Sequence, residues 1–134
     1  MDELPEWPPG TVAILSTGAG APHAIPVSTA VRTGPRAIHL ALALRRESLA
    51  RLREDPRCAL TLLLPGATVT AHGHATIAAA IAVGVAAVRI DVDAIQDHDD
   101  ERFTIDAGVR WRWTDAEAER RDAEIHAALR GLAP

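Results

Sequence analysis

The stretch from Arg36 to Leu44 constrains the fold more than any other part of the chain, because its two faces differ in size. Side chains two positions apart point to the same face of a strand. One face carries the bulky residues Ile38, Leu40, Leu42 and Leu44. The other carries Ala37, Ala41 and Ala43, with His39 among them. We expect the bulky face to pack into a core. The small face leaves room for something flat, although a merely Ala-rich strand is the plainer alternative.

Further segments with alternating or β-branched apolar residues predict more strands around this one. They cover residues 11–17, 23–32, 58–64, 68–78 and 85–95, with a last strand or bulged pair at 103–105 and 109–113. Residues 79–84 fit a strand, a helix or a loop. Two helices are expected, one over 45–55 and one after a capping box at Thr114 and Glu117. Six or seven antiparallel strands predict a mainly β, closed or nearly closed barrel, with residues 1–134 as a single domain.

Charge and composition exclude several classes of function. The 134 residues carry a formal net charge of −4, which provides no long-range attraction for nucleic acid or anionic lipid. The sequence contains 14 Arg and no Lys, so Schiff-base chemistry through lysine is excluded. No apolar stretch reaches the roughly 20 residues that a membrane-spanning helix needs, and no leader peptide is recognisable. We therefore expect a soluble, cytoplasmic protein that binds neither nucleic acid nor a membrane.

Several other residues could bind a metal or act as nucleophiles, but their sequence context favours structural roles. Cys58 opens an apolar run and is expected to be a buried, inert thiol. His72 and His74 share one face of a strand, but no carboxylate or cysteine accompanies them at a metal-ligand spacing, so no metal site is expected. The acidic run 97–101 lacks EF-hand spacing and is expected to be a solvated loop. No serine lies in a nucleophile-elbow motif.

The junction after Leu44 places Arg45 and Arg46 at the start of a helix, where unpaired backbone N–H groups and the helix dipole already favour negative charge. Two cations at this end are unfavourable unless an anion lies among them. Together with the Ser48 hydroxyl they form a plausible phosphate cradle. The alternative is two solvated arginines, one of them paired with Glu47 or with an acid elsewhere.

Aromatic residues are scarce, at 3% of the chain, so each is expected to anchor a core, an interface or a ligand. Trp111 and Trp113 lie on one face of the last predicted strand, and Phe103 precedes them. A core or dimer contact is the first expectation for these rings, and stacking on a cofactor is the alternative.

The order and spacing of several motifs resemble a known family. The motifs are Val12-Ala-Ile-Leu-Ser-Thr17, Gly20-Ala-Pro-His-Ala-Ile-Pro-Val-Ser28, Ile38-His-Leu-Ala41, Arg51-Leu-Arg-Glu-Asp-Pro-Arg57 and Val109-Arg-Trp-Arg-Trp113 before a helix. Over about Gly10 to Leu132 the chain resembles the pyridoxamine 5'-phosphate oxidase-like, FMN-binding split-barrel family. The resemblance implies a split β-barrel that forms a homodimer, with the flavin at the subunit interface.

The resemblance also implies a set of cofactor-binding residues. It assigns the isoalloxazine ring to Pro26, Val27 and Ser28, and the phosphate to Arg45, Arg46 and Ser48. It gives Ala41 and Ala43 a flat partner, and it places Trp111 or Trp113 near the flavin of the facing subunit. His39 is included because strand parity puts it on the same face as Ala41.

Two departures from the family pattern limit what is carried over. The family's frequent Lys, two residues after a Ser in the phosphate-binding segment, corresponds to Ser48 here, and Arg46 takes the Ser position. The oxidase's C-terminal substrate segment, with its Arg-x-His pattern, is missing. Oxidation of pyridoxamine phosphate is therefore not expected.

The expected function is that of an FMN-dependent oxidoreductase, in which a hydride passes through flavin N5 to or from a small organic substrate or a nicotinamide donor. No catalytic residue is assigned, although His39 or His72 would suit as a proton donor. One alternative is a deazaflavin-dependent reductase, whose anionic cofactor tail would use Arg32, Arg36 and Arg51. The other is a non-catalytic protein that binds flavin or haem, with the histidines as the first candidate ligands.

Overall fold

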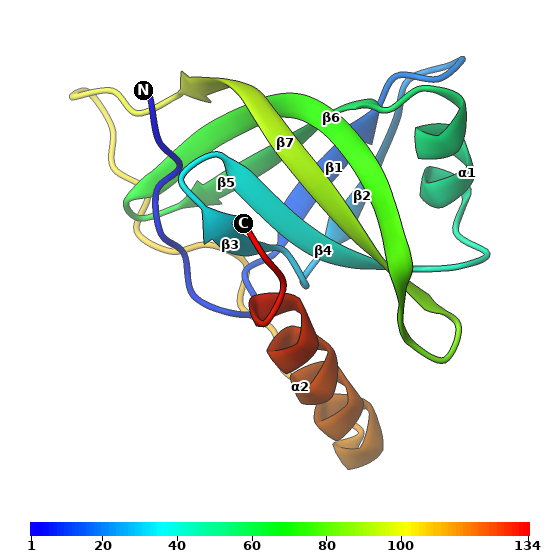
Figure 1. The fold of residues 1–134 in the computed structure, drawn as a ribbon. Coiled ribbons are helices and arrows are strands. Elements are labelled where there is room, and N and C mark those ends of the chain that lie inside the picture. The colour runs from blue at the N-terminus through cyan, green and yellow to red at the C-terminus, as the bar shows by residue number, and fades with distance from the viewer.

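The computed structural model describes residues 1–134 apart from the side chain of Ala79, and the described residues form seven strands and two helices (Figure 1). The elements in chain order are β1 (Ala13–Thr17), β2 (His23–Val27), β3 (Val31–Gly34), β4 (Ala37–Ala43), α1 (Glu47–Glu54), β5 (Arg57–Leu64), β6 (Ala67–Ala82), β7 (Val85–Asp97) and α2 (Ala116–Arg130). The strands form one sheet in the order β2-β1-β5-β6-β7-β4-β3, and each pair of neighbouring strands is antiparallel.

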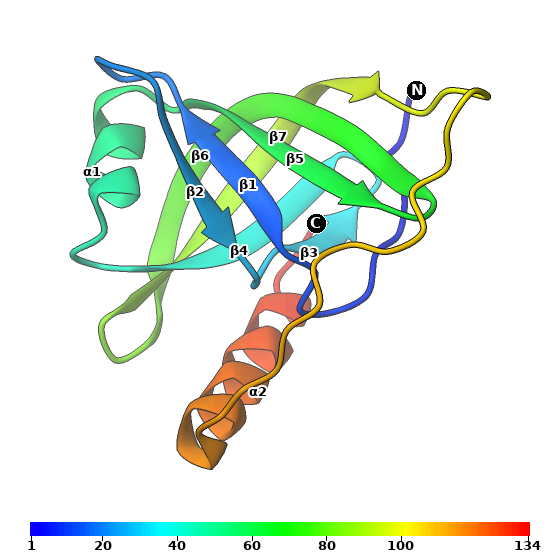
Figure 2. The same cartoon turned by 180° about the vertical axis from the view of Figure 1, so that it is seen from behind.

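A three-residue connection forces this sheet to curl into a barrel. Strands β2 and β3 lie at opposite edges of the sheet, yet only residues 28–30 join them. Four Cα-to-Cα steps span at most about 14 Å, so the two edges must come together. Thr29 attaches this connection to β4: its Oγ1 accepts a hydrogen bond from the Ala41 amide at 3.0 Å and donates to the Ala41 carbonyl at 3.3 Å. The predicted split β-barrel is confirmed (Figure 2).

The barrel interior is filled by the alternating apolar residues of the strands. Ile38, Leu40 and Leu42 of β4 are at most 2% exposed, as the size alternation predicted. They pack with similarly buried residues from the other strands, including Leu15, Leu60, Leu62, Val69, Val88 and Ile90. Leu44 is the exception. It lies beyond the end of β4 and is 48% exposed.

Helix α2 covers part of the small face of β4. Leu129 forms a second apolar cluster with Val31 and Ala87, and Ala41 and Ile125 pack against this cluster. In the single chain a helix, rather than a ligand, is therefore the neighbour of Ala41. Figure 1 shows that the first turns of α2 project beyond the barrel, so only the second half of the helix lies against the sheet.

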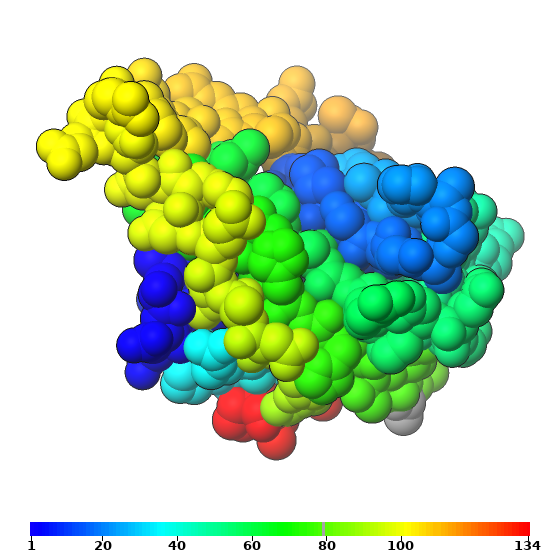
Figure 3. All heavy atoms as spheres, turned by 90° about the horizontal axis from the view of Figure 1, so that it is seen from above, coloured from blue at the N-terminus to red at the C-terminus, as the bar shows by residue number. Residues whose placement is uncertain are grey.

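Two predicted strands are corrected by the structure. Residues 23–32 are not one strand, because the chain turns a corner at 28–30, where the Thr29 side chain takes the place of a ladder partner. Residues 103–113 form no strand. This segment runs along one side of the barrel, as Figure 3 shows in yellow to orange. A side-chain hydrogen bond holds the segment against the barrel: the Trp111 indole N–H donates to the Gly10 carbonyl at 2.8 Å.

Two boundaries also differ from the prediction. The ambiguous residues 79–84 divide between the end of β6 and a hairpin turn, in which Gly84 has a φ of 72°. The cap of α2 is Asp115 rather than Thr114, because the Asp115 carboxylate accepts a bond from the Ala118 amide at 3.3 Å. Neither of the described helices is long and apolar enough to cross a membrane.

A glycine at the bulge of β6 gives a test of this packing. The β6–β7 register shifts between His72 and Gly73, and a Cβ on Gly73 would overlap the Asp91 carbonyl oxygen of β7. Because backbone cannot move aside as a flexible side chain can, Gly73→Ala should lower the free energy of unfolding by about 3 kcal/mol, the upper end of overpacking costs. Urea denaturation measures this. Gly18→Ala is the matched control, since its nearest atom would be 3.8 Å away. An equal effect of both variants would contradict the register.

Candidate functional site

The residues predicted to hold a flavin ring lie at the open end of β2. Pro26, Val27 and Ser28 line a hollow of about 230 Å³ together with Val12 and Trp111. Trp111 is 40% exposed, and its indole N–H bond to the Gly10 carbonyl fixes the orientation of the ring. The hollow is mostly apolar: its polar side-chain groups are the Ser28 hydroxyl and the Trp111 indole N–H, which is bonded to Gly10.

A larger groove lies between the end of β4, the β6–β7 hairpin and the first half of α2. Its volume is about 700 Å³, and its lining includes Ala43, Arg45, Trp113, Arg121 and Asp122. The structure therefore brings together two predicted site residues, Arg45 and Trp113, that are 68 positions apart in the sequence.

A pair of tryptophans connects the hollow with the groove. Trp111 lines the first and Trp113 the second. Their ring centroids are 5.2 Å apart and the ring planes meet at 79°, which is a favourable edge-to-face contact. The predicted ring-binding residues thus lie beside one tryptophan of this pair, and the predicted phosphate-binding residue Arg45 lies in the groove beside the other.

Two predicted site residues on β4 lie apart from both cavities. Ala41 packs beneath α2. His39 is only 4% exposed, and its Nδ1 is 2.7 Å from the Thr33 hydroxyl. Burial lowers the pKa of His39, and the nearby Arg89 lowers it further. His39 lines neither the hollow nor the groove, so a role as proton donor to a ligand there has no geometric support.

The predicted phosphate cradle is only partly open. Arg45 and Arg46 are exposed, and neither is paired with a carboxylate among the described side chains. Ser48, by contrast, is completely buried, and its Oγ is 3.2 Å from Nε2 of His23. A phosphate could use this hydroxyl only by displacing the contact with His23.

A polar network at the start of α1 was not predicted from the sequence. His23 of β2 contacts the Ser48 hydroxyl through one ring nitrogen and the Glu47 carboxylate, at 3.4 Å, through the other. Arg51 approaches the second Glu47 oxygen at 3.5 Å. These contacts link a serine to a histidine and the histidine to a glutamate, as in a hydrolytic triad. However, Ser48 has no exposed surface through which a substrate could reach it, so the network ties β2 to α1.

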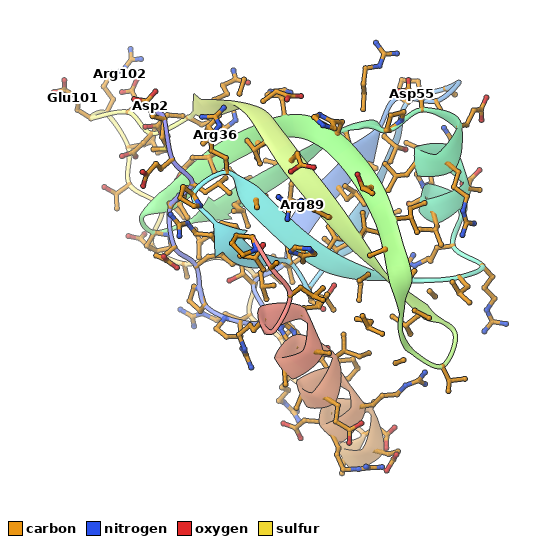
Figure 4. The ribbon with its side chains drawn as sticks, in the orientation of Figure 1. Asp2, Arg36, Asp55, Arg89, Glu101 and Arg102 are labelled. Carbon is orange, nitrogen blue, oxygen red and sulfur yellow. The ribbon has the colours of Figure 1, made fainter. Side chains whose placement is uncertain are left out.

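The arginines considered for a deazaflavin tail are engaged within the chain. Arg32 is 3.2 Å from a Glu6 carboxylate oxygen, and it donates to the Leu4 carbonyl. Arg36 donates to the carbonyls of Asp2, Val92 and Asp93, and Figure 4 shows Arg36 beside Asp2 at one end of the sheet. Arg51 holds the Ala19 and Ala21 carbonyls.

The remaining candidates for chemistry have ordinary surroundings. His72 and His74 project from the same face of β6, as predicted. They contact Gln96 at 3.4 Å and Asp93 at 3.1 Å. No group of three metal-ligating side chains lies together among the described residues. Cys58 is buried, and burial raises the pKa of its thiol to about 12, so it remains protonated and unreactive near neutral pH.

Comparison with known proteins identifies the fold. No protein-family model matches the sequence, and no curated protein matches it. Similar solved structures include a Listeria innocua protein assigned as a pyridoxamine 5'-phosphate oxidase (TM-score 0.58, 12% identity, covering 67% of this chain and 90% of that one). Another is BorF, the flavin reductase component of a bacterial two-component tryptophan halogenase (0.58, 12%, 68% and 81%). A third is an F420 reductase (0.56, 10%, 65% and 90%).

These likenesses confirm the predicted resemblance at the level of the fold. The chain has the split-barrel fold of pyridoxamine 5'-phosphate oxidase-like proteins, flavin reductases and an F420 reductase. Two of these structures are reductases by name, one of flavin and one of F420. At 10–12% identity the likeness carries no further than the fold.

The buried His39 predicts a pH dependence of stability. Because its pKa in the folded protein lies below the ordinary value of 6.5, the unfolded chain takes up a proton first as the pH falls. The free energy of unfolding should therefore decrease as the pH falls below 6.5, down to the lowered pKa of the folded state. Chemical denaturation between pH 7.5 and 5 measures this slope. His39→Gln should flatten it. An unchanged slope in His39→Gln would contradict the assignment.

Proposed function

We propose that the protein is a flavin-dependent oxidoreductase whose isoalloxazine ring lies against Pro26, Val27, Ser28 and Trp111. The observation that carries the proposal is the apolar hollow itself. The segment that the family resemblance assigns to the ring faces an oriented, half-exposed tryptophan there. The fold shared with flavin and F420 reductases supports the same reading.

The residues fit the ring better than they fit the phosphate of FMN. At about 230 Å³ the hollow is smaller than the roughly 300–1,000 Å³ typical of ligand pockets, so one chain supplies one wall of the ring site. On the other side of the tryptophan pair, Arg45 lines the groove and is available to an anionic tail, and the next residue, Arg46, is also exposed. Ser48 is not, because it is buried against His23.

Each residue of the proposed site has a physical role. A bound flavin would supply the hydride chemistry at its N5. Pro26, with its fixed φ, keeps the end of β2 rigid under the ring. Trp111 keeps water from the ring face, and Ser28 offers a hydrogen-bonding group at its edge. Arg45 attracts the anionic tail, or a nicotinamide phosphate, into the groove.

A second copy of the chain is proposed to complete the site. The segment after β7 exposes three large apolar side chains beside the hollow and the groove: Val109, Trp111 and Trp113, which are 38–66% exposed. Apolar groups gathered in this way are typical of an interface. A facing subunit that covers them would supply the second wall of the ring site.

The alternative cofactors have weaker support. A deazaflavin tail needs several free cations, and Arg32, Arg36 and Arg51 are all held by groups of the chain itself. Haem needs an axial ligand, and none of the histidines lines the hollow or the groove. A flavin therefore remains the cofactor of the proposal.

Flavin binding is tested by titrating the protein with FMN and with riboflavin while the absorbance and fluorescence of the flavin are followed. We expect saturable binding that Trp111→Ala weakens about tenfold or more, since one aromatic contact and its buried area are lost. Phe103→Ala is the matched control. It removes an equally exposed aromatic ring of the same segment that touches neither cavity. Equal weakening by both variants would place the flavin elsewhere, and no binding of either flavin would exclude the proposal.

The dimer is tested by light scattering and sedimentation at micromolar concentration. We expect the wild-type protein to sediment as a dimer and Val109→Asp to sediment as a monomer, because a buried unpaired carboxylate is costly at an apolar interface. Val83→Asp, on the β6–β7 hairpin, introduces the same charge at a 90% exposed position and should leave the dimer intact. A monomeric wild-type protein, with and without flavin, would contradict a shared site.

A further inference from the structure

The first turn of α1 already binds an anion that belongs to the chain itself. The Glu47 carboxylate lies at the first helical position, where the helix dipole favours negative charge. One of its oxygens is 3.4 Å from His23 Nδ1, and the other is 3.5 Å from an Arg51 nitrogen. These are the types of group that would otherwise hold a phosphate.

Two further contacts fix this arrangement. Ser48, the next residue, is fully buried, and it contacts the other nitrogen of the His23 ring. Arg51 donates to the carbonyls of Ala19 and Ala21, which anchors it to the β1–β2 loop. The hydroxyl and the least exposed cation near the helix start, Arg51, are therefore both engaged, and Glu47 adds a charge that repels a second anion.

We infer that Glu47 is a specificity-determining residue that excludes phosphate from the start of α1. The inference rests on the proposed flavin site and names the form of flavin that it takes, which is one recognised by its ring and its uncharged ribityl chain. Only the exposed Arg45 and Arg46 remain for a terminal phosphate, and exposed ion pairs contribute little to affinity. FMN should bind no more than about threefold more tightly than riboflavin.

The first test uses inorganic phosphate and needs no flavin. In ¹H–¹⁵N NMR spectra, the amides of residues 47–49 in the wild-type protein should show no saturable shift with phosphate. Glu47→Gln keeps the size of the side chain but removes its charge, and the same amides should then shift saturably. Glu54→Gln removes a charge from the exposed last turn of the same helix, and it should behave as the wild type. Equal behaviour of the wild type and Glu47→Gln, whether both bind or neither does, would overturn the inference.

The second test compares the dissociation constants of FMN and riboflavin. Glu47→Gln should tighten FMN binding about three- to fivefold, because it removes one charge that repels the FMN phosphate at the helix start. It should leave riboflavin binding unchanged. Ser48→Ala should leave the ratio of the two constants unchanged, because its hydroxyl is buried. A wild-type preference for FMN of tenfold or more, or equal effects of Glu47→Gln on both flavins, would overturn the inference. If neither flavin binds, the proposed function fails, and the phosphate titration still decides the role of Glu47.

Discussion

The three-residue link between β2 and β3 is the constraint on which the rest of the structure depends. It joins the two edges of a seven-stranded sheet, so the sheet has to close on itself. Thr29 secures the closure by bonding to both backbone groups of Ala41. The same corner positions Ser28 and the end of β2 beside Trp111. The geometry of the candidate ring site is therefore a direct consequence of how the barrel closes.

The two halves of the candidate site differ in how well they suit a flavin. The hollow at Trp111 is apolar and has an oriented aromatic wall, as a planar ring requires. At the start of α1, the Glu47 carboxylate contacts His23 and Arg51, and the Ser48 hydroxyl that was predicted to hold a phosphate is buried. The chain thus combines the fold seen in a flavin reductase with a helix start that offers no free serine hydroxyl to a phosphate. A preference for the flavin ring over the nucleotide tail accounts for both observations.

Sequence patterns predicted most of the barrel, because residues of different size or polarity alternate along its strands, as large and small residues do from Arg36 to Leu44. The corner at residues 28–30 was missed because Thr29 keeps the alternation in step while its side chain, not its backbone, makes the bonds. Residues 103–113 alternate as well, but they join no strand of the sheet, and a side-chain bond from Trp111 to the Gly10 carbonyl holds them instead. The network at α1 was beyond sequence reasoning, since His23 and Glu47 meet only through the packing of α1 against the barrel.

The central claim, that the flavin ring lies at the tryptophan pair, is tested most directly by following the indole N–H signals of the three tryptophans in ¹H–¹⁵N NMR spectra during a riboflavin titration. The account predicts large, saturable shifts of the Trp111 and Trp113 signals. Trp7, whose indole N–H bonds to the Ala30 carbonyl, should respond least. Shifts confined to Trp7, or saturable binding that leaves both Trp111 and Trp113 unchanged, would contradict the account.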